Sequence, residues 1–102
     1  MERDLFDACL LGDLSQVTSL SQRSDISQCL NWENPEKHGR SALHAAVLSE
    51  NLQVIEFLIE KLHADTEKAD VAGKIPLDVA WENNSKDIVA LLKHTSKFMQ
   101  SI

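Results

Sequence analysis

Glycine is scarce in this chain of 102 residues, and its three copies, Gly12, Gly39 and Gly73, lie far apart. A phosphate-binding loop needs several glycines within a few residues, because the backbone must approach the phosphates closely. The sequence therefore lacks a nucleotide-binding loop of this kind. It also lacks the glycine-rich turn that exposes a catalytic serine.

Cysteine is scarce as well. The two cysteines, Cys9 and Cys29, are too few for a disulfide framework, and each lies in sequence that we expect to be helical and buried. Together with the histidines at 38, 44, 63 and 94, they match no metal-ligand spacing such as C-x-x-C or H-x-x-x-H. We therefore expect no metal, no other cofactor and a reducing compartment.

Long hydrophobic runs are missing. Residues 1–13 carry charges at Glu2, Arg3, Asp4 and Asp7, so they do not form the apolar core of a signal peptide. No later run approaches the length that spans a membrane. We expect a protein of the cytoplasm, the nucleus or both, without membrane insertion.

Positive charge is in deficit, because 10 lysines and arginines stand against 16 acidic residues and give a net charge of -6. The average field repels phosphate backbones and anionic lipids, so we expect no nucleic-acid partner. Apolar residues make up 43% of the chain, which is typical of a folded globular protein. Its length suits one domain, residues 1–102.

The chain contains an internal repeat. Residues 39–65 match residues 73–96 at a spacing of 34, since Gly39 aligns with Gly73 (73 − 39) and Val54 with Ile88 (88 − 54). A fixed period of this length is typical of stacked repeat proteins.

A third, weaker unit begins near the N-terminus. Leu5, Ala8 and Gly12 take the places of Leu43, Ala46 and Glu50, at an offset of 38 (43 − 5). The extra residues fall in 21–37, which is rich in turn-forming side chains and can absorb them as loop.

Each unit reads as two short antiparallel helices. In the second unit, Ser41 begins a helix to about residue 48, and apolar residues at three- and four-residue steps predict another over 52–62. In the third unit Pro76 suits a first helical turn, and the second helix begins near Lys86. Residues 31–40 and 63–74 read as extended fingers, in which Gly39 and Gly73 supply unusual backbone angles.

The sequence Ser41-Ala42-Leu43-His44-Ala45-Ala46-Val47 resembles the T-P-L-H-x-A-A signature of the ankyrin-repeat family. The third unit keeps Pro76, Leu77 and Ala80 of this signature. The resemblance implies an all-α solenoid of stacked helix-turn-helix units with β-turn fingers, and repeats at about 4–30, 36–69 and 70–96. The outer two are degenerate, as caps are expected to be, and a tail follows at 97–102.

Departures from the family pattern have expected consequences. Leu62 and an inserted His63 replace the glycine that usually ends the second helix, so we expect a distorted helix end. Ile75 and Asp78 replace the threonine and histidine whose hydrogen bonds usually tie one turn to the next. We therefore expect the finger of the third unit, residues 63–74, to be looser, and call it the third finger.

His44 follows the hydroxyl of Ser41 by three residues and therefore resembles part of a catalytic pair. The resemblance implies a structural role instead, in which this histidine hydrogen-bonds across the turn and holds repeats in register. Catalysis would also need an orienting carboxylate and oxyanion donors, which the sequence does not assemble. We expect no enzyme and no small-molecule substrate.

With catalysis, metal binding and nucleic-acid binding set aside, recognition of a protein partner is the function that we expect. In ankyrin stacks the fingers and first helices line a concave face on which partners usually bind. Carried over by position, the resemblance assigns partner binding to Leu10, Leu11, Lys37, His38, Arg40, Leu48, Ser49, Val71, Lys74, Glu82 and Asn83. Trp32 is added because tryptophan often anchors interfaces.

Several of these residues allow a packing role as well. Leu10 and Leu48 either form an apolar row that binds a partner or pack against each other and under the first loop. Trp32 either anchors a partner or packs that loop against the stack, and we favour the packing role. We expect Trp81 to cover the open end of the core. The residues after Lys93 either fold back as a cap, begin a further repeat or linker, or dock a partner.

Two functions from different classes fit this sequence better than catalysis does. One is an interaction module that acts as an adaptor, inhibitor or targeting subunit. The other is the N-terminal regulatory domain of a larger enzyme, channel or lipid-transfer protein. The mass of the endogenous protein separates them.

Overall fold

A computed structural model describes residues 2–95, so the predictions made for the tail lie outside the described residues. The described elements are all helical: α1 (Glu2–Leu11), α2 (Leu14–Leu20), α3 (Ile26–Asn31), the 3-10 helix η1 (Pro35–Lys37), α4 (Ala42–Ser49), α5 (Leu52–Glu56), the π-helix η2 (Phe57–Lys61), α6 (Pro76–Glu82) and α7 (Lys86–Thr95). Within residues 2–95 the only extended pairing is an isolated bridge between Asn34 and Arg40.

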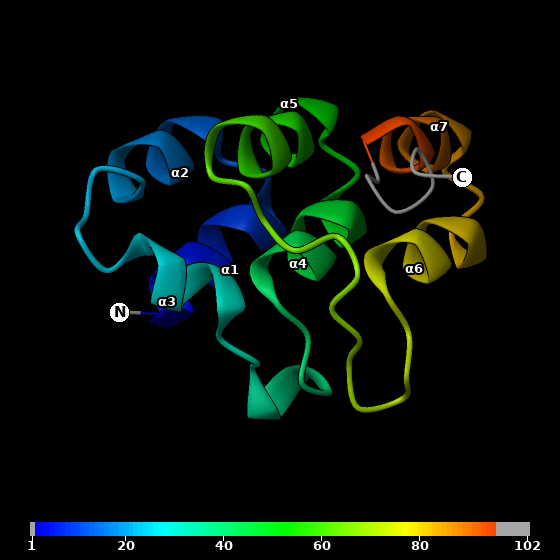
Figure 1. The fold of residues 1–102 in the computed structure, drawn as a ribbon, viewed down its shortest axis with the longest axis horizontal. Coiled ribbons are helices and arrows are strands. Elements are labelled where there is room, and N and C mark those ends of the chain that lie inside the picture. Colours follow the sequence, from blue (N-terminus) through cyan, green and yellow to red (C-terminus); the bar gives the residue numbers. More distant parts are fainter. Residues whose placement is uncertain (1, 96–102) are drawn as a thin grey trace.

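The helices form two layers, and the fingers project from one of them (Figure 1). The first helices of the units, α1, α4 and α6, lie side by side, and the second helices, α2, α5 and α7, cover them on one side. The two fingers, which precede α4 and α6, extend away from the second helices. This arrangement confirms the predicted all-α solenoid and the assignment of first and second helices.

The core lies around α4, the first helix of the middle unit. Residues 42–47 are all buried, because α1 covers one side of this helix, α6 the other, and α5 packs on it from the second layer. Small alanines at 42, 45 and 46 let the neighbouring helices approach, while Leu43 and Val47 fill the space between them. Full burial of a leucine or valine contributes roughly 1.5–3 kcal/mol, so this helix holds the stack together.

The stretch 21–37, where we expected the extra residues of the first unit to be absorbed as loop, contains a further helix. Ile26, Cys29 and Leu30 recur at three- and four-residue steps and give α3 one apolar face, which packs on α1 and α4. Cys29 and Leu30 are buried, which confirms the prediction for Cys29. The extra residues of the first unit are thus absorbed partly by this short helix and partly by the connections 21–25 and 32–34 on either side of it.

The end of the second helix in the middle unit is distorted, as predicted. It changes from α5 to the π-helix η2, in which the Leu62 N–H donates to the Phe57 carbonyl five residues earlier, at 3.3 Å. His63 then adopts a left-handed conformation with φ 57°, and the Ala64 N–H donates to the Leu58 carbonyl at 2.9 Å. The inserted residue is thus absorbed inside the helix.

Both predicted finger glycines have positive φ, 69° at Gly39 and 80° at Gly73. At Gly39 there is a second constraint, since a Cβ there would lie 2.8 Å from Val71 Cγ2 of the next finger. A Cβ on Gly73 would meet no atom within 4 Å. A side chain at position 39 would therefore have to displace Val71, in addition to adopting a left-handed backbone conformation.

Candidate functional site

Hydrogen bonds and ion pairs join the two fingers, including one between Lys68 Nζ and Glu33 Oε2 at 2.9 Å. The Val71 N–H donates to the His38 carbonyl at 2.9 Å. Arg40 Nε lies 3.5 Å from Asp70 Oδ2, and His44 Nε2 lies 2.9 Å from the Lys74 carbonyl oxygen. A backbone hydrogen bond, ion pairs and an imidazole hydrogen bond therefore hold the two fingers side by side.

His44 connects its own helix start to the next finger. The Ser41 backbone N–H can only donate, so Nδ1, at 3.1 Å, is the acceptor. The Lys74 carbonyl can only accept, so Nε2 carries the proton. The side chain is completely buried, and this desolvation lowers its pKa below the ordinary value. The predicted role in repeat register is confirmed by this geometry.

The same geometry argues against catalysis by Ser41 and His44. The hydroxyl lies 2.9 Å from Nδ1, as a catalytic pair would require. Both residues are buried, however, and both ring nitrogens already have partners in the scaffold. A substrate has no access to the pair.

Asp70 closes the turn of the finger that precedes α6, the finger of the third unit. Its Oδ1 accepts from the N–H groups of Ala72 and Lys74, each at 2.9 Å, and its carboxylate also faces Arg40. Burial by itself raises the pKa of Asp70, but the hydrogen bonds from Lys74, Arg40 and Ala72 outweigh it and lower this pKa below its usual range.

Asp78 takes over only half of the role of the histidine it replaces. Its Oδ2 accepts from the Ile75 N–H at 3.1 Å, just as His44 accepts from Ser41. A carboxylate has no proton to pass to a following finger. Asp70 nevertheless closes the turn with hydrogen bonds. The expected looseness of this finger stays a prediction.

The predicted binding residues on the first helices occupy different environments. Leu11 is 81% exposed at the end of α1. Leu10 and Leu48 are half-buried and pack against the core, which favours the packing alternative for them. Ser49 is half-buried and donates its hydroxyl to the Ala46 carbonyl at 2.7 Å. Asn83 is exposed at the end of α6.

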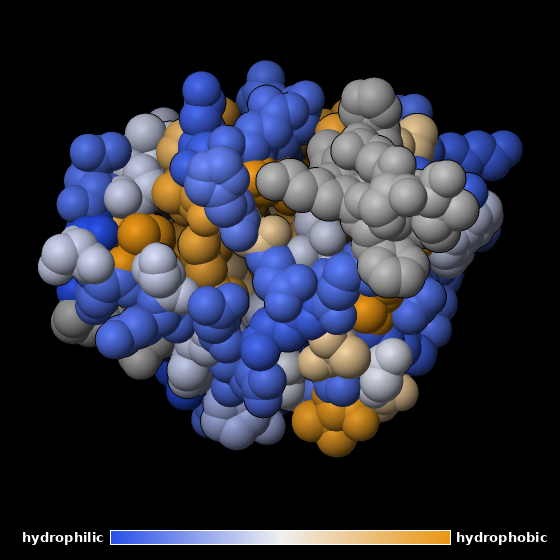
Figure 2. Space-filling model, viewed as in Figure 1, coloured by the Kyte–Doolittle hydropathy of each residue, from blue (hydrophilic) through white to orange (hydrophobic). Residues whose placement is uncertain are grey.

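The predicted finger residues are mostly accessible. Lys37 and His38 are exposed, and Val71 is 83% exposed. Figure 2 shows hydrophobic surface at the tip of the finger before α6, below the polar surface that covers much of this face. Arg40 and Lys74 are partly covered and ion-paired, to Asp70 and Glu82 respectively.

The two tryptophans differ in exposure. Trp32 is half-buried, meets Phe6 edge to face at a centroid distance of 6.3 Å, and has the Arg3 guanidinium 5.6 Å from its ring centroid. These contacts support the packing role. Trp81 is 54% exposed, with the Lys93 ammonium 5.0 Å from its ring centroid, so much of this ring remains on the surface.

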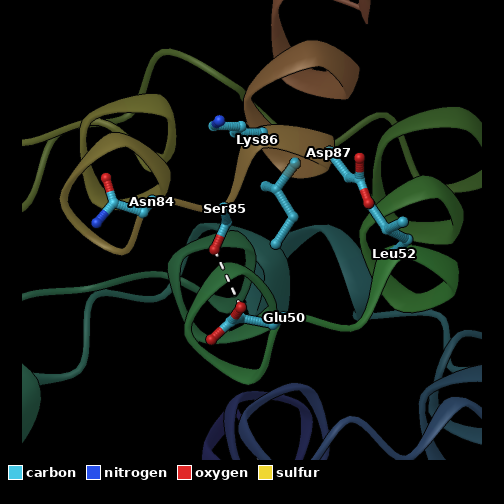
Figure 3. A pocket seen from close by; sticks show the side chains of 7 residues that line it. Glu50, Leu52, Asn84, Ser85, Lys86 and Asp87 are labelled. Atoms are coloured by element: carbon cyan, nitrogen blue, oxygen red, sulfur yellow. Dashed lines mark hydrogen bonds between the residues drawn. The ribbon is translucent and has the colours of Figure 1, made fainter.

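A polar pocket of about 250 Å³ lies between the helix turns of the second and third units (Figure 3). Glu50 has φ 58° in the place of Gly12, and its Oε1 accepts from the Ser85 hydroxyl at 3.1 Å. The bond joins consecutive turns and accounts for a glutamate at a position suited to glycine. Sequence reasoning missed this link, although the alignment of Glu50 with Gly12 signals something unusual there.

The described residues 2–95 contain neither a cluster of metal-ligating side chains nor a membrane-spanning helix. No group of three or more potential metal-ligating side chains lies together among residues 2–95. No helix in this part of the chain is long and apolar enough to cross a membrane.

Stacked helix pairs, fingers fixed by hydrogen bonds and a histidine joining successive units define a helical repeat protein. The family model for ankyrin repeats in three copies matches residues 5–101. The chain therefore belongs to the ankyrin-repeat family, whose domains are generally protein-interaction modules and typically non-catalytic.

Similar proteins have diverse contexts. Notch-regulated ankyrin repeat-containing protein B of Danio rerio is 31% identical over 98% of this chain and 88% of its own length. Protein phosphatase 1 regulatory subunit 27 of Homo sapiens is 38% identical over 79% of this chain and 49% of its own. Potassium channel AKT1 of Arabidopsis thaliana is 41% identical over 58% of this chain, and the match spans only 7% of the channel.

The fold is also found in a solved complex, that of the Bd0816 predatory endopeptidase from Bdellovibrio bacteriovorus with immunity protein Bd3460. A chain of that complex matches with a TM-score of 0.80 and 28% identity, over 91% of this chain and 46% of that one.

Proposed function

We propose that this protein binds a protein partner through the face formed by its fingers and the ends of its first helices. We call this the binding face and define it by Leu11, Lys37, His38, Val71 and Asn83. The observation that carries the proposal is Val71, which is 83% exposed at the tip of a finger held by backbone and side-chain hydrogen bonds.

An exposed apolar residue on a fixed turn suits recognition. Hydrogen bonds to Asp70 already close the turn that carries Val71, which reduces the conformational entropy that binding would cost there. Leu11 adds a second apolar side chain at 81% exposure. A partner that covers both removes apolar area from water without disturbing the core.

The charges of this region favour Lys37 as a polar contact. Arg40 and Lys74 are already paired with Asp70 and Glu82. Lys37 has no ion pair among those identified in residues 2–95 and is exposed. A carboxylate on the partner is the natural counterpart, with a contribution that falls as salt increases.

The protein's action is then that of an adaptor, inhibitor or targeting subunit without catalysis, nucleic-acid binding or a small-molecule substrate. The names of two similar proteins support this, because one is a regulatory subunit and one comes from an enzyme–immunity protein complex. We propose a cytoplasmic or nuclear location. Both cysteines are buried in the helical core and neither forms a disulfide, as is usual for proteins of a reducing compartment.

The test is affinity capture from native lysate with the wild-type chain and the Leu11→Glu/Val71→Glu variant, read by mass spectrometry. Both side chains are exposed, so the variant should keep its helical circular dichroism spectrum. Leu10→Glu and Leu48→Glu are unsuitable, because those side chains pack against the core.

The matched control is Ser19→Glu/Ala90→Glu, which adds the same charge at exposed sites on α2 and α7. We expect the control to retain a partner that the binding-face variant loses. Equal capture by all three chains would contradict the assignment of the binding face.

A second function keeps the same face but places it in a larger protein, as the regulatory domain of an enzyme, channel or lipid-transfer protein. The chain covers 7% of a potassium channel and 14% of a mouse mitochondrial glutaminase liver isoform, which favours such a setting. The mass of the endogenous protein distinguishes the two. A mass near 11.4 kDa supports the adaptor, and a much larger one supports the regulatory domain.

A further inference from the structure

A second surface lies in the other helix layer, between α2 and the helix formed by α5 and η2. It is a shallow pocket of about 210 Å³, which we call the outer groove. These elements are neighbours in the layer of second helices (Figure 1), away from the fingers. Its lining residues are Leu14, Gln53, Glu56, Phe57, Glu60 and Lys61.

The groove has an apolar floor. Leu14, at the start of α2, and Phe57, at the start of η2, are half-buried and pack against the core. The volume is below the roughly 300 Å³ at which pockets for drug-sized ligands begin, so it suits a single apolar side chain.

The rim is acidic and unneutralised. Glu56 and Glu60 are exposed, four residues apart on one helix, where like charges repel each other. No ion pair identified within residues 2–95 engages either carboxylate. Lys61 supplies one positive charge, so the rim keeps a net negative charge. A cationic ligand would relieve the repulsion between the two glutamates.

The backbone at this place is unusual as well. The π-helix η2 begins at Phe57 and carries Glu60 and Lys61, so three of the lining residues lie on a turn with widened hydrogen bonding. Single π-turns inside α-helices occur frequently at functional sites. Here the wider turn supplies one floor residue and two residues of the rim.

We propose that the outer groove binds a segment of a protein partner in which one apolar side chain is flanked by lysine or arginine residues. The apolar side chain enters between Leu14 and Phe57, and the flanking cations pair with Glu56 and Glu60. The site is separate from the binding face, so a partner that reaches both surfaces gains avidity without any new contact between them. The charge of the rim selects a basic peptide over an anionic lipid surface.

The test is chemical-shift mapping of the ¹⁵N-labelled chain with three synthetic peptides. The probe is acetyl-Lys-Arg-Leu-Arg-Lys-amide, one analogue replaces leucine by serine, and one replaces all four cations by glutamate. We expect the probe to shift the amides of Leu14, Gln53 and Phe57, the serine analogue to bind more weakly, and the acidic peptide to shift none of them.

Two double variants make the test specific. Glu56→Gln/Glu60→Gln should weaken the probe about fivefold, as expected for the loss of two exposed ion pairs. Asp4→Asn/Asp7→Asn removes the same charge from exposed sites on α1 and should leave the affinity unchanged. Equal weakening by both pairs, or shifts spread over all acidic surfaces, would overturn the proposal, as would the absence of shifts. Leu11→Glu/Val71→Glu should not affect this probe, so the result is independent of the binding face.

Discussion

The replacement of His44 by alanine tests how the stack keeps its register. The imidazole accepts from the Ser41 N–H at 3.1 Å and donates to the Lys74 carbonyl at 2.9 Å, and it is 0% exposed. Alanine leaves both backbone groups without this partner and removes the ring from the contact between the second and third units. We therefore expect a loss of stability together with loosening of the third finger.

The magnitude follows from these contacts. An unsatisfied buried donor or acceptor costs about 1–3 kcal/mol. Ser41 is buried, so its N–H is left unsatisfied, whereas the Lys74 carbonyl keeps the hydrogen bond that the Asp70 N–H donates to it at 2.9 Å. Together with the cavity left by the fully buried ring, the unsatisfied Ser41 N–H gives a total of about 3 kcal/mol. This corresponds to a decrease in melting temperature of about 15 °C for a domain of this size.

The assay is thermal and urea unfolding followed by circular dichroism at neutral pH. His44→Asn is the informative comparison, because its side-chain oxygen can still accept from Ser41, as Asp78 accepts from Ile75, but cannot reach Lys74. We expect it to fall between wild type and His44→Ala. A change below about 0.5 kcal/mol for His44→Ala, which is the size of ordinary surface effects, would refute the argument.

Three further predictions concern proton uptake, thiol reactivity and a glycine. Burial lowers the pKa of His44 below 6.5, so the unfolded chain binds a proton at this histidine more readily than the folded chain does. The stability contributed by the neutral, buried imidazole is therefore complete above pH 6.5 and is lost as the pH falls through and below that value. Urea midpoints of the wild type should therefore fall more between pH about 7.5 and about 5.5 than those of His44→Asn, and parallel slopes would contradict this. Burial raises the pKa of Cys9 to about 12, so its thiol should resist iodoacetamide at pH about 8 until the chain is unfolded, and rapid labelling of the native protein would contradict the packing. Gly39→Ala should lower the free energy of unfolding more than Gly73→Ala. Both substitutions place alanine at a positive φ, which costs roughly 1–2 kcal/mol, but only the Cβ at position 39 also meets Val71. Equal urea midpoints for the two variants would contradict this contact.

The helices of the second and third units were predictable because two local signals agree there. The apolar period marks α5, and the proline at 76 and the serine at 41 mark helix starts. α3 was harder, because one turn of apolar spacing in a polar stretch is too short to distinguish from loop. Packing on α1 and α4 stabilises it, and that contact depends on the assembled stack.

The candidate sites were predictable to different degrees. The repeat register placed Leu11, Lys37, His38 and Val71 correctly at accessible positions, since a repeat fixes which residues lie on fingers and helix ends. The repeat register could not show that Leu48 packs against the core, because a leucine that packs and a leucine that binds a partner can occupy the same position of the repeat. The outer groove depends on side chains from two separate helices and on a π-turn, neither of which leaves a sequence period.

The central claim is that a protein partner contacts the binding face, and hydrogen–deuterium exchange of the captured complex tests it directly. Amide exchange would be compared with and without the partner, using peptides that cover both fingers, the ends of α1 and α6, and the second helices. We expect slower exchange at Val71, His38 and the residues after Leu11, with α7 unchanged. Protection confined to the second helices, with both fingers unaffected, would contradict the account.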